Sequence, residues 1–404
     1  MKILLVNSVC GVTSTGRICT DLAKAYLENG HEVQIAYGRV DKGMPEECAK
    51  YSKRIGTDFD VKLHGFQTRF FDRHGFGSRR ATEQFLTWVD EYRPDVVHLH
   101  NLHGYYINIE LLFQYLKEKA LPVVWTLHDC WAMTGHCTYF SASGCDKWKT
   151  QCGHCPQKHE YPQSNGLDSS AENYRRKKDA FTGVRNLLIT TPSAWLKSLV
   201  EQSYLRDYAV QVVHNGIDTS VFKPTESDLR EQYGLAEQKI VLGVANGWGE
   251  RKGLKYLKRM AGDLPAGWKV VLVGLSDEQL EQLPGNMLGI RRTNSPQELA
   301  AWYTTADVFV SPTLEDNYPT TILEAQACST PVVVFSSGGA PETVMPGKGY
   351  VVRRLDYDDL LQKTIRAADL KKDFGQIEIK DKKSLGSEYE AIYQRLLEQR
   401  GQER

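Results

Sequence analysis

The sequence lacks the features of several protein classes. It nowhere has about 18 successive apolar residues, the length that a membrane-spanning helix needs. The apolar run at Met1 to Val6 is too short for a signal peptide, so we expect a cytoplasmic protein. Lysine plus arginine equals aspartate plus glutamate at 50 each, so no overall charge draws the chain to nucleic acid or to a membrane. Short repeats and low-complexity tracts are also absent.

The length and the composition are those of an ordinary folded protein. At 404 residues the chain exceeds what one hydrophobic core usually serves, which favours two domains. Its 41% hydrophobic and 25% charged residues match soluble globular chains. The nine cysteines are an odd number, which together with the missing export signal argues against a disulfide framework.

Short β-branched runs alternate with segments of helical spacing, and this pattern occurs twice. The pattern predicts two α/β domains, each with a parallel sheet covered by helices on both faces. In the first series, the expected strands are 3–6, 33–37, 96–99, 123–127, 187–190 and 210–213, and the expected helices are 17–28, 81–92, 109–119 and 194–202. In the second, the strands are 239–244, 270–273, 308–310 and 332–335, and the helices are 254–260, 296–305 and 321–327.

The boundary between the domains is expected at 214–226, where an Asn-Gly turn precedes a polar stretch with Pro224. We therefore assign 1–214 to an N-terminal, acceptor-side domain and 215–384 to a C-terminal, donor-binding domain. The amphipathic segment 385–398 fits either domain by its pattern, and we place the C-terminal helix, 385–404, with the first. Ligands of parallel sheets bind beyond the carboxyl ends of the strands, so we expect the chemistry in a cleft between the two sheets.

The loop after the strand 308–310 is rich in polar groups. It reads Ser-Pro-Thr-Leu-Glu-Asp-Asn-Tyr-Pro-Thr-Thr-Ile-Leu-Glu-Ala and places Asp316 before a helix whose first turn holds Glu324. Thr321 and Glu324 have the spacing of a capping box, which explains Glu324 but not Asp316. Free N–H groups at such a helix start can instead hold a diphosphate, while the carboxylates bind sugar hydroxyls.

Three further segments fit a phosphate or sugar ligand. Arg251-Lys252-Gly253 opens a helix, where two cations are opposed by the helix dipole unless an anion binds. The loop Gly11-Val12-Thr13-Ser14-Thr15-Gly16-Arg17 follows the first strand, and Gly16 would let a ligand approach closely. His128-Asp129 ends the strand 123–127.

Together these segments resemble the retaining glycosyltransferases of family 4, which have the GT-B architecture of two Rossmann-like domains facing each other across a cleft. The carboxylate eight residues before Glu324 carries the resemblance, together with His214-Asn215-Gly216-Ile217-Asp218. The chain departs from the family pattern at Asp316, where glutamate is commoner, and at Asn317-Tyr318-Pro319, where Gly-Phe-Gly is usual. This variant is similar to transferases of capsule and colanic-acid biosynthesis, a kind of surface polysaccharide or exopolysaccharide synthesis.

The resemblance implies which residues act. His128, Asp316 and Glu324 would be catalytic, and the donor, a nucleotide diphosphate sugar, would contact the following residues: Gly16, Arg251, Lys252, Asn317, Tyr318, Thr320, Thr321 and Glu324. No covalent nucleophile is evident, so the acceptor hydroxyl would attack on the face that the diphosphate leaves, with retention. The acceptor would be a glycan or a lipid-linked glycan.

Two patterns suggest metals. Asp58-Phe59-Asp60 and Asp356-Tyr357-Asp358 match a metal-binding tripeptide of another glycosyltransferase architecture, but neither has its context, and we assign no catalytic metal. Four cysteines, Cys137, Cys145, Cys152 and Cys155, have spacings that suit a structural zinc site or four reduced thiols equally well. The block that contains them looks like an insert of colanic-acid-type transferases.

The segment 69–80 mixes aromatic and basic residues. It fits a surface segment with buried rings somewhat better than a contact with anionic headgroups at the inner face of a membrane. Two other functions stay open for the whole chain. A sugar-nucleotide epimerase would consume the donor without an acceptor, and a non-catalytic binding protein would not turn it over.

Overall fold

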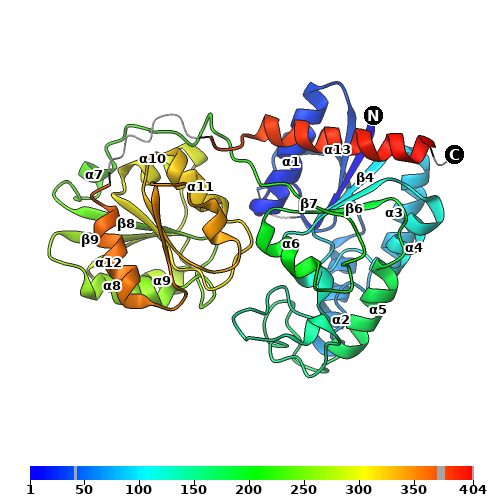
Figure 1. Ribbon diagram of the computed structural model, residues 1–404, viewed down its shortest axis with the longest axis horizontal. Helices are drawn as coiled ribbons and strands as arrows, with labels where there is room; N and C mark the ends of the chain where they lie inside the picture. Colours follow the sequence, from blue (N-terminus) through cyan, green and yellow to red (C-terminus); the bar gives the residue numbers. More distant parts are fainter. Residues whose placement is uncertain (41–42, 371–377, 403–404) are drawn as a thin grey trace. The chain divides into compact units, whose positions relative to one another are not determined.

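The computed structural model describes residues 1–40, 43–370 and 378–402. The chain divides into two compact units (Figure 1). The first consists of Met1–His214 together with the C-terminal helix α13 (Lys382–Gln402), and the second of Asn215–Asp381.

Within the described part of the first unit, seven parallel strands form one sheet in the order β3-β2-β1-β4-β5-β6-β7. The strands are β1 (Lys2–Asn7), β2 (Glu32–Tyr37), β3 (Ser52–Arg54), β4 (Val96–Leu99), β5 (Val123–Thr126), β6 (Leu187–Thr191) and β7 (Val210–Val212). The helices are α1 (Thr13–Glu28), α2 (Asp58–Phe71), α3 (Arg79–Tyr92), α4 (Ile109–Lys119), α5 (Ser170–Phe181) and α6 (Ala194–Val200), with 3-10 turns η1 (Glu46–Tyr51), η2 (Trp131–Met133) and η3 (Lys147–Lys149).

The second unit has a sheet of six parallel strands among its described residues, in the order β10-β9-β8-β11-β12-β13. The strands are β8 (Lys239–Val244), β9 (Trp268–Val273), β10 (Met287–Ile290), β11 (Val308–Ser311), β12 (Val332–Phe335) and β13 (Gly349–Val352). The helices are α7 (Leu229–Gln232), α8 (Leu254–Asp263), α9 (Asp277–Glu281), α10 (Pro296–Thr305), α11 (Thr320–Ala327) and α12 (Tyr357–Ala367), with the 3-10 turn η4 (Ala340–Thr343).

Each sheet separates two hydrophobic cores, because successive side chains of a strand point to opposite faces. In β1, Ile3 and Leu5 belong to one core and Leu4 and Val6 to the other. The strand β8 distributes its side chains in the same way, with Val241 on the face opposite to Ile240 and Leu242. Burial on both faces explains why these strands read as continuous apolar runs.

The helix α13 completes the first unit although it follows the second unit in sequence. Leu385, Tyr389, Ile392 and Tyr393 join the core that α1 covers. The Tyr393 hydroxyl lies 3.0 Å from the Tyr26 hydroxyl and 2.6 Å from Nδ1 of His98. Figure 1 shows α13 running across the first unit beside α1.

The Asn-Gly turn lies where the two connections between the units run side by side. Ile217 N donates to Lys380 O at 3.0 Å, and Ile217 pairs with Asp381 in a parallel bridge. A Cβ atom on Gly216 would lie 2.7 Å from the carbonyl oxygen of Asp381. Glycine is therefore required here by the close approach of a second backbone segment.

Candidate active site

In the second unit, two cations meet the predicted carboxylate Asp316. Lys252 Nζ lies 2.5 Å from Asp316 Oδ2, and Arg251 Nη1 donates to the carbonyl oxygen of Glu315 at 2.8 Å. Burial by itself would raise the pKa of Asp316, but the charges of Lys252 and Arg251 outweigh it and hold that pKa below its usual value. Asp316 is therefore ionised at neutral pH, and both cations are fixed beside it.

Two glycines make this arrangement possible. Gly253 caps α8 with a φ of +76°, and a Cβ atom there would lie 2.0 Å from the carbonyl oxygen of Pro312. Gly338, with a φ of +59°, would place a Cβ atom 1.9 Å from the carbonyl oxygen of Asp316, which accepts a hydrogen bond from Gly339 N at 3.0 Å. The Asp316 loop is thus held between two close backbone contacts that only glycine permits.

The structure changes our interpretation of Glu324. The helix α11 begins at Thr320 after Pro319, and no side chain caps it, so the capping box of Thr321 and Glu324 is not formed. Glu324 Oε2 instead accepts a hydrogen bond of 3.0 Å from the hydroxyl of Tyr303, which is fully buried. Glu324 is thus a carboxylate positioned by a tyrosine from the neighbouring helix α10.

The other predicted donor contacts lie around the same helix start. Asn317 is buried, and its backbone N–H donates to Asp316 Oδ1 at 3.0 Å. Tyr318 is half-buried, which raises the pKa of its hydroxyl to about 12. Thr320 and Thr321 form the first turn of α11 and are partly accessible. All of these residues follow the carboxyl end of β11, where an open parallel sheet binds ligands.

In the first unit, His128 lies at the end of β5 and lines a small pocket with the following residues: His100, Asn101, Leu102, His103, Trp125, Leu127, Asp129, Trp131 and Ala132. Its Nε2 atom is 3.0 Å from Nδ1 of His100. Burial lowers the pKa of His128 to about 4, so the imidazole is neutral at physiological pH. It can exchange hydrogen bonds with a ligand but carries no charge.

A histidine–aspartate contact beside His128 was not predicted from the sequence. His103 Nε2 lies 2.7 Å from Asp129 Oδ2, and Asp129 Oδ1 accepts from Trp131 N at 2.9 Å. Burial would raise the pKa of Asp129, but His103 lowers it below its usual value. The sequence pointed to Asp129 only as the neighbour of His128. Both residues follow the carboxyl end of β5, and that position was a signal that Asp129 also belongs to the site.

Gly16 lies inside α1, one turn after its start, and is buried. A Cβ atom there would lie 3.1 Å from Val9 Cγ2 and 3.4 Å from Gly11 N. The backbone N–H of Gly11 donates to Gly16 O at 3.2 Å. Gly16 therefore has a role in packing the loop against its own helix, and its contact with the donor stays a prediction.

Comparisons with known proteins identify the family. The model described as Glycosyltransferase Family 4 matches residues 15–221, and the one described as Glycosyl transferases group 1 matches residues 238–369. The chain belongs to glycosyltransferase family 4. It is 24% identical over 379 residues, 90% of each chain, to the putative colanic acid biosynthesis glycosyl transferase WcaC of Escherichia coli. A D-inositol 3-phosphate glycosyltransferase of Corynebacterium jeikeium is 31% identical over 217 residues, 47% of this chain and 52% of that one.

Solved structures confirm the GT-B fold that the family 4 resemblance predicted. Sucrose-phosphate synthase from Thermosynechococcus elongatus superposes with a TM-score of 0.68 at 17% identity, covering 99% of this chain and 97% of that one. Anabaena HepE in complex with UDP-glucose superposes with a TM-score of 0.62 at 16% identity, covering 100% of both chains. The predicted fold class of two α/β domains with parallel sheets is therefore confirmed.

Four of the nine cysteines of this family 4 chain gather around one pocket. Cys137, Cys145, Cys152 and Cys155 line it together with His136 and Trp148, among others. A hydrogen bond between the Cys137 and Cys155 thiols raises the pKa of Cys137 and lowers that of Cys155 to about 7. Across the described ranges, no group of three or more His, Cys, Asp or Glu side chains is arranged to hold a metal ion. Four thiols are the donors that structural zinc prefers, and zinc stays a prediction.

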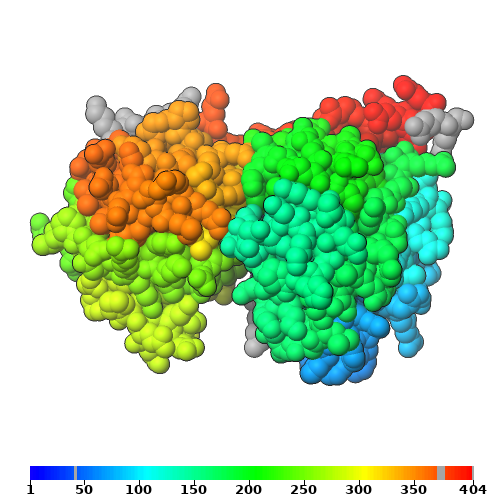
Figure 2. Space-filling model, turned by 60° about the horizontal axis from the view of Figure 1, so that its bottom comes forward, coloured from blue at the N-terminus to red at the C-terminus, as the bar shows by residue number. Residues whose placement is uncertain are grey.

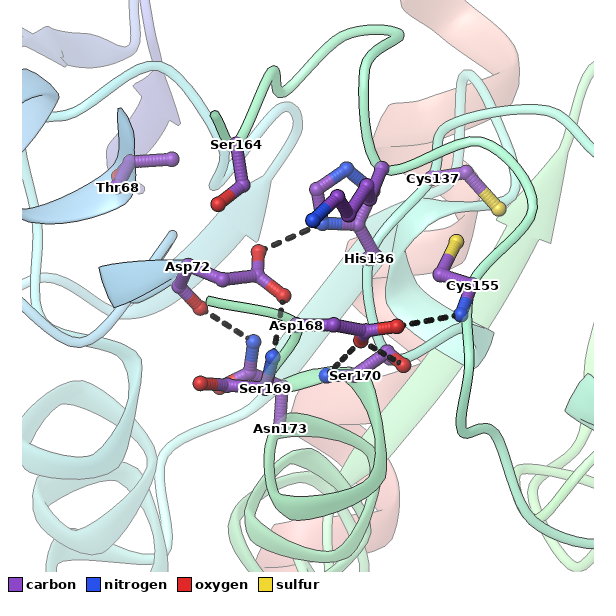
Figure 3. A network of polar contacts seen from close by, with 12 residues as sticks. Thr68, Asp72, His136, Cys137, Cys155, Ser164, Asp168, Ser169, Ser170 and Asn173 are labelled. Carbon is purple, nitrogen blue, oxygen red and sulfur yellow. Dashed lines mark hydrogen bonds and ion pairs between the residues drawn. The ribbon is translucent and has the colours of Figure 1, made fainter. Parts of the chain in front are cut away.

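A polar network, buried at His136 and Asp72, fixes this cysteine segment to α2 and α5 (Figure 3). His136 Nδ1 lies 2.6 Å from Asp72 Oδ1, and Asp72 Oδ2 accepts from Ser169 N at 2.9 Å. Asp168 Oδ2 accepts from Cys155 N at 2.6 Å. The cysteine segment is thus built into the first unit rather than attached loosely to it.

The two Asp-x-Asp tripeptides have structural roles. Asp60 forms a capping box with Thr57 at the start of α2, and Asp356 accepts from Asp359 N at the start of α12. No described helix of the family 4 chain is both long and apolar enough to span a bilayer.

Proposed function

We propose that the chain is a retaining hexosyl- or related sugar transferase that moves a sugar from a nucleotide diphosphate sugar to a glycan or lipid-linked acceptor in surface polysaccharide biosynthesis. The observation that carries this proposal is the cluster of Lys252, Arg251 and Asp316 beside the start of α11. The name of the colanic acid relative supports the polysaccharide, and HepE, solved with UDP-glucose, supports the class of donor.

The cations have a clear use in this reaction. Breaking the bond to the sugar leaves negative charge on the diphosphate, and preorganised cations stabilise such charge by several kcal/mol. Lys252 is held by Asp316, and Arg251 is held by the carbonyl oxygen of Glu315, so neither must be reoriented when the donor binds. We propose that these two side chains, rather than a metal ion, stabilise the negative charge on the leaving diphosphate.

The carboxylates and His128 would orient the sugars. Glu324, positioned by Tyr303, would accept hydrogen bonds from donor hydroxyls. The neutral imidazole of His128 would exchange hydrogen bonds with the transferred sugar without protonating the leaving group. The departing phosphate would then take the proton from the acceptor hydroxyl, so that attack and departure occur on one face and the configuration is retained.

A thermal-shift screen against UDP-, GDP- and ADP-sugars tests donor binding. A ligand at 100 times its Kd adds about 2.7 kcal/mol to the stability of the unit that binds it. We expect one class of donor to stabilise the parent protein. If no nucleotide sugar does so, the donor proposal is wrong.

Turnover with and without an acceptor then separates the functions. Consumption of donor without acceptor indicates the epimerase, and binding without turnover indicates a non-catalytic protein. NMR of the product gives the anomeric configuration, and an inverted linkage would contradict retention.

A further inference from the structure

The helix α2 exposes a row of large apolar side chains. Phe59, Leu63, Phe66 and Phe70 are 72%, 45%, 53% and 46% exposed. Their spacings of four, three and four residues place all of them on one face of the helix, which we call the α2 apolar row. The rings of Phe66 and Phe70 lie 4.6 Å apart, so the row is continuous at its C-terminal half.

Exposure of this kind is concentrated on α2. Among the described residues, twelve large hydrophobic side chains are exposed, and five of them belong to this one helix. Another is Leu167, whose backbone N–H donates to the carbonyl oxygen of Phe70 at 3.0 Å, next to the end of the row. Single exposed apolar residues are ordinary, whereas a contiguous apolar patch marks a surface that meets something other than water.

Cations border the row. Lys62 and Arg69 each precede a member of the row by one residue, so they share one flank of the helix, and Arg73 follows the helix end. All three are exposed. Asp58, at the start of the helix on the same flank, pairs with Arg54, and Asp60 accepts a hydrogen bond from Thr57 N. Positive charge therefore borders the C-terminal half of the row, at Arg69 and Arg73.

The inner side of α2 is firmly attached. His64 and Thr68 are buried, and His64 Nε2 accepts hydrogen bonds from Gly75 N at 3.1 Å and Gly77 N at 3.3 Å. The C-cap residue Asp72 is buried in its pair with His136. Figure 2, in which the lower side of Figure 1 comes forward, shows the mid-blue segment that contains α2 at the surface of the first unit. The row is thus a fixed outer face.

We propose that the α2 apolar row, bordered by Lys62, Arg69 and Arg73, docks the protein on the surface of an anionic lipid bilayer. An amphipathic helix with aromatic rings on one face and cations beside them lies in the interface between headgroups and acyl chains. A second copy is the weaker occupant, because an identical copy carries the same cations beside its row and so offers no excess of negative charge to pair with them. The inference rests on the proposed function in one respect, since a lipid-linked acceptor would lie at that surface.

Vesicle flotation at physiological salt tests this directly. We expect the parent protein to float with vesicles of phosphatidylcholine and phosphatidylglycerol and to stay behind with pure phosphatidylcholine. Each cation near an anionic surface contributes about 1 kcal/mol, so Lys62→Gln should weaken binding about fivefold. Phe66→Ser/Phe70→Ser should abolish flotation, because the row loses its two stacked rings.

Leu27→Ser is the matched control, since Leu27 is 41% exposed on α1 of the same unit, and it should float like the parent. Circular dichroism and melting establish that each variant is folded. Three results would each overturn the proposal. The parent and the row variant float equally, the parent does not float at all, or the parent is a dimer and the row variant is a monomer. Sugar transfer to a soluble acceptor separates the membrane proposal from the proposed function, because the row variant should keep that activity. Absent transfer in a parent that floats would contradict the enzymatic proposal alone.

Discussion

The substitution Glu324→Gln separates a structural role from a functional role at one position. The carboxylate accepts a hydrogen bond from Tyr303, and a glutamine oxygen can accept the same bond. What the fold loses is the charge on the acceptor, worth about 1 kcal/mol. For a domain of this size, that change lowers Tm by about 2–4 °C. The variant should therefore fold and melt close to the parent.

The effect on transfer should be much larger. A carboxylate that accepts hydrogen bonds from donor hydroxyls forms charge-assisted bonds, and losing one costs about 1.5–3 kcal/mol. That loss lowers kcat/KM by about 10- to 150-fold. Steady-state kinetics with the donor varied, beside a melting curve for the same preparation, measures both quantities.

Tyr303→Phe is the matched control. It removes the buried hydroxyl that positions Glu324 but leaves the carboxylate, so we expect a lower Tm and a smaller loss of kcat/KM than in Glu324→Gln. If Glu324→Gln transfers sugar as fast as the parent, Glu324 serves the packing of α10 and α11 only, and the proposed donor site loses its main carboxylate.

Two further predictions concern charged groups. Lys252→Ala should weaken donor binding, measured by calorimetry, whereas Lys255→Ala, which breaks an exposed pair with Glu250, should not; equal donor affinity in both would contradict the phosphate role. The folded pKa of Asp316 is lowered, so its contribution to stability exists above its unfolded pKa of about 3.9 and is lost as pH falls through the folded pKa. The Tm difference between parent and Lys252→Ala should thus be largest near pH 7, and it should diminish as the pH falls below about 4. For the cysteine pocket, elemental analysis of protein purified without added metal decides between the two alternatives: one zinc per chain would support a structural zinc site, and four freely titrating thiols without zinc would support reduced cysteines.

Much of the fold could be predicted because strands buried on both faces leave an unmistakable pattern. The strands β4 and β8 and the helix α4 coincide with their expected ranges. Three strands were not predicted: β3, which has the polar sequence Ser-Lys-Arg, β10, which contains Gly289, and β13, which begins at Gly349. All three are edge strands, with one neighbour each in the sheet, so their residues need not be apolar.

The helix α2 was missed for a different reason. Its phenylalanines and leucine face outward, against the usual rule that apolar side chains mark the inner face. For 69–80, which covers only the last residues of this helix, a surface segment with buried rings was favoured somewhat over a contact with anionic headgroups. The structure instead exposes Phe70 and Phe71, and that interpretation is wrong for these two residues. A periodic apolar face predicts a helix, but it does not tell whether that face meets a core or something outside the chain.

The candidate site could be predicted only as residues along the sequence. Asp316 and Lys252 were both named, but their ion pair joins positions 64 residues apart and depends on close contacts at Gly253 and Gly338. The bond from Tyr303 to Glu324 likewise crosses from α10 to α11. Such contacts arise from tertiary packing, which the spacing of residues within one segment does not contain.

The position of α13 has a consequence for how the protein is made. A ribosome releases the strands of the first unit early, but the core beside α1 stays incomplete until Leu385, Tyr389 and Tyr393 emerge. All of the second unit is synthesised in between, and domains generally fold as they leave the ribosome. The nascent first unit therefore keeps Tyr26 and its neighbours uncovered during this interval, and such transiently exposed apolar surface favours aggregation.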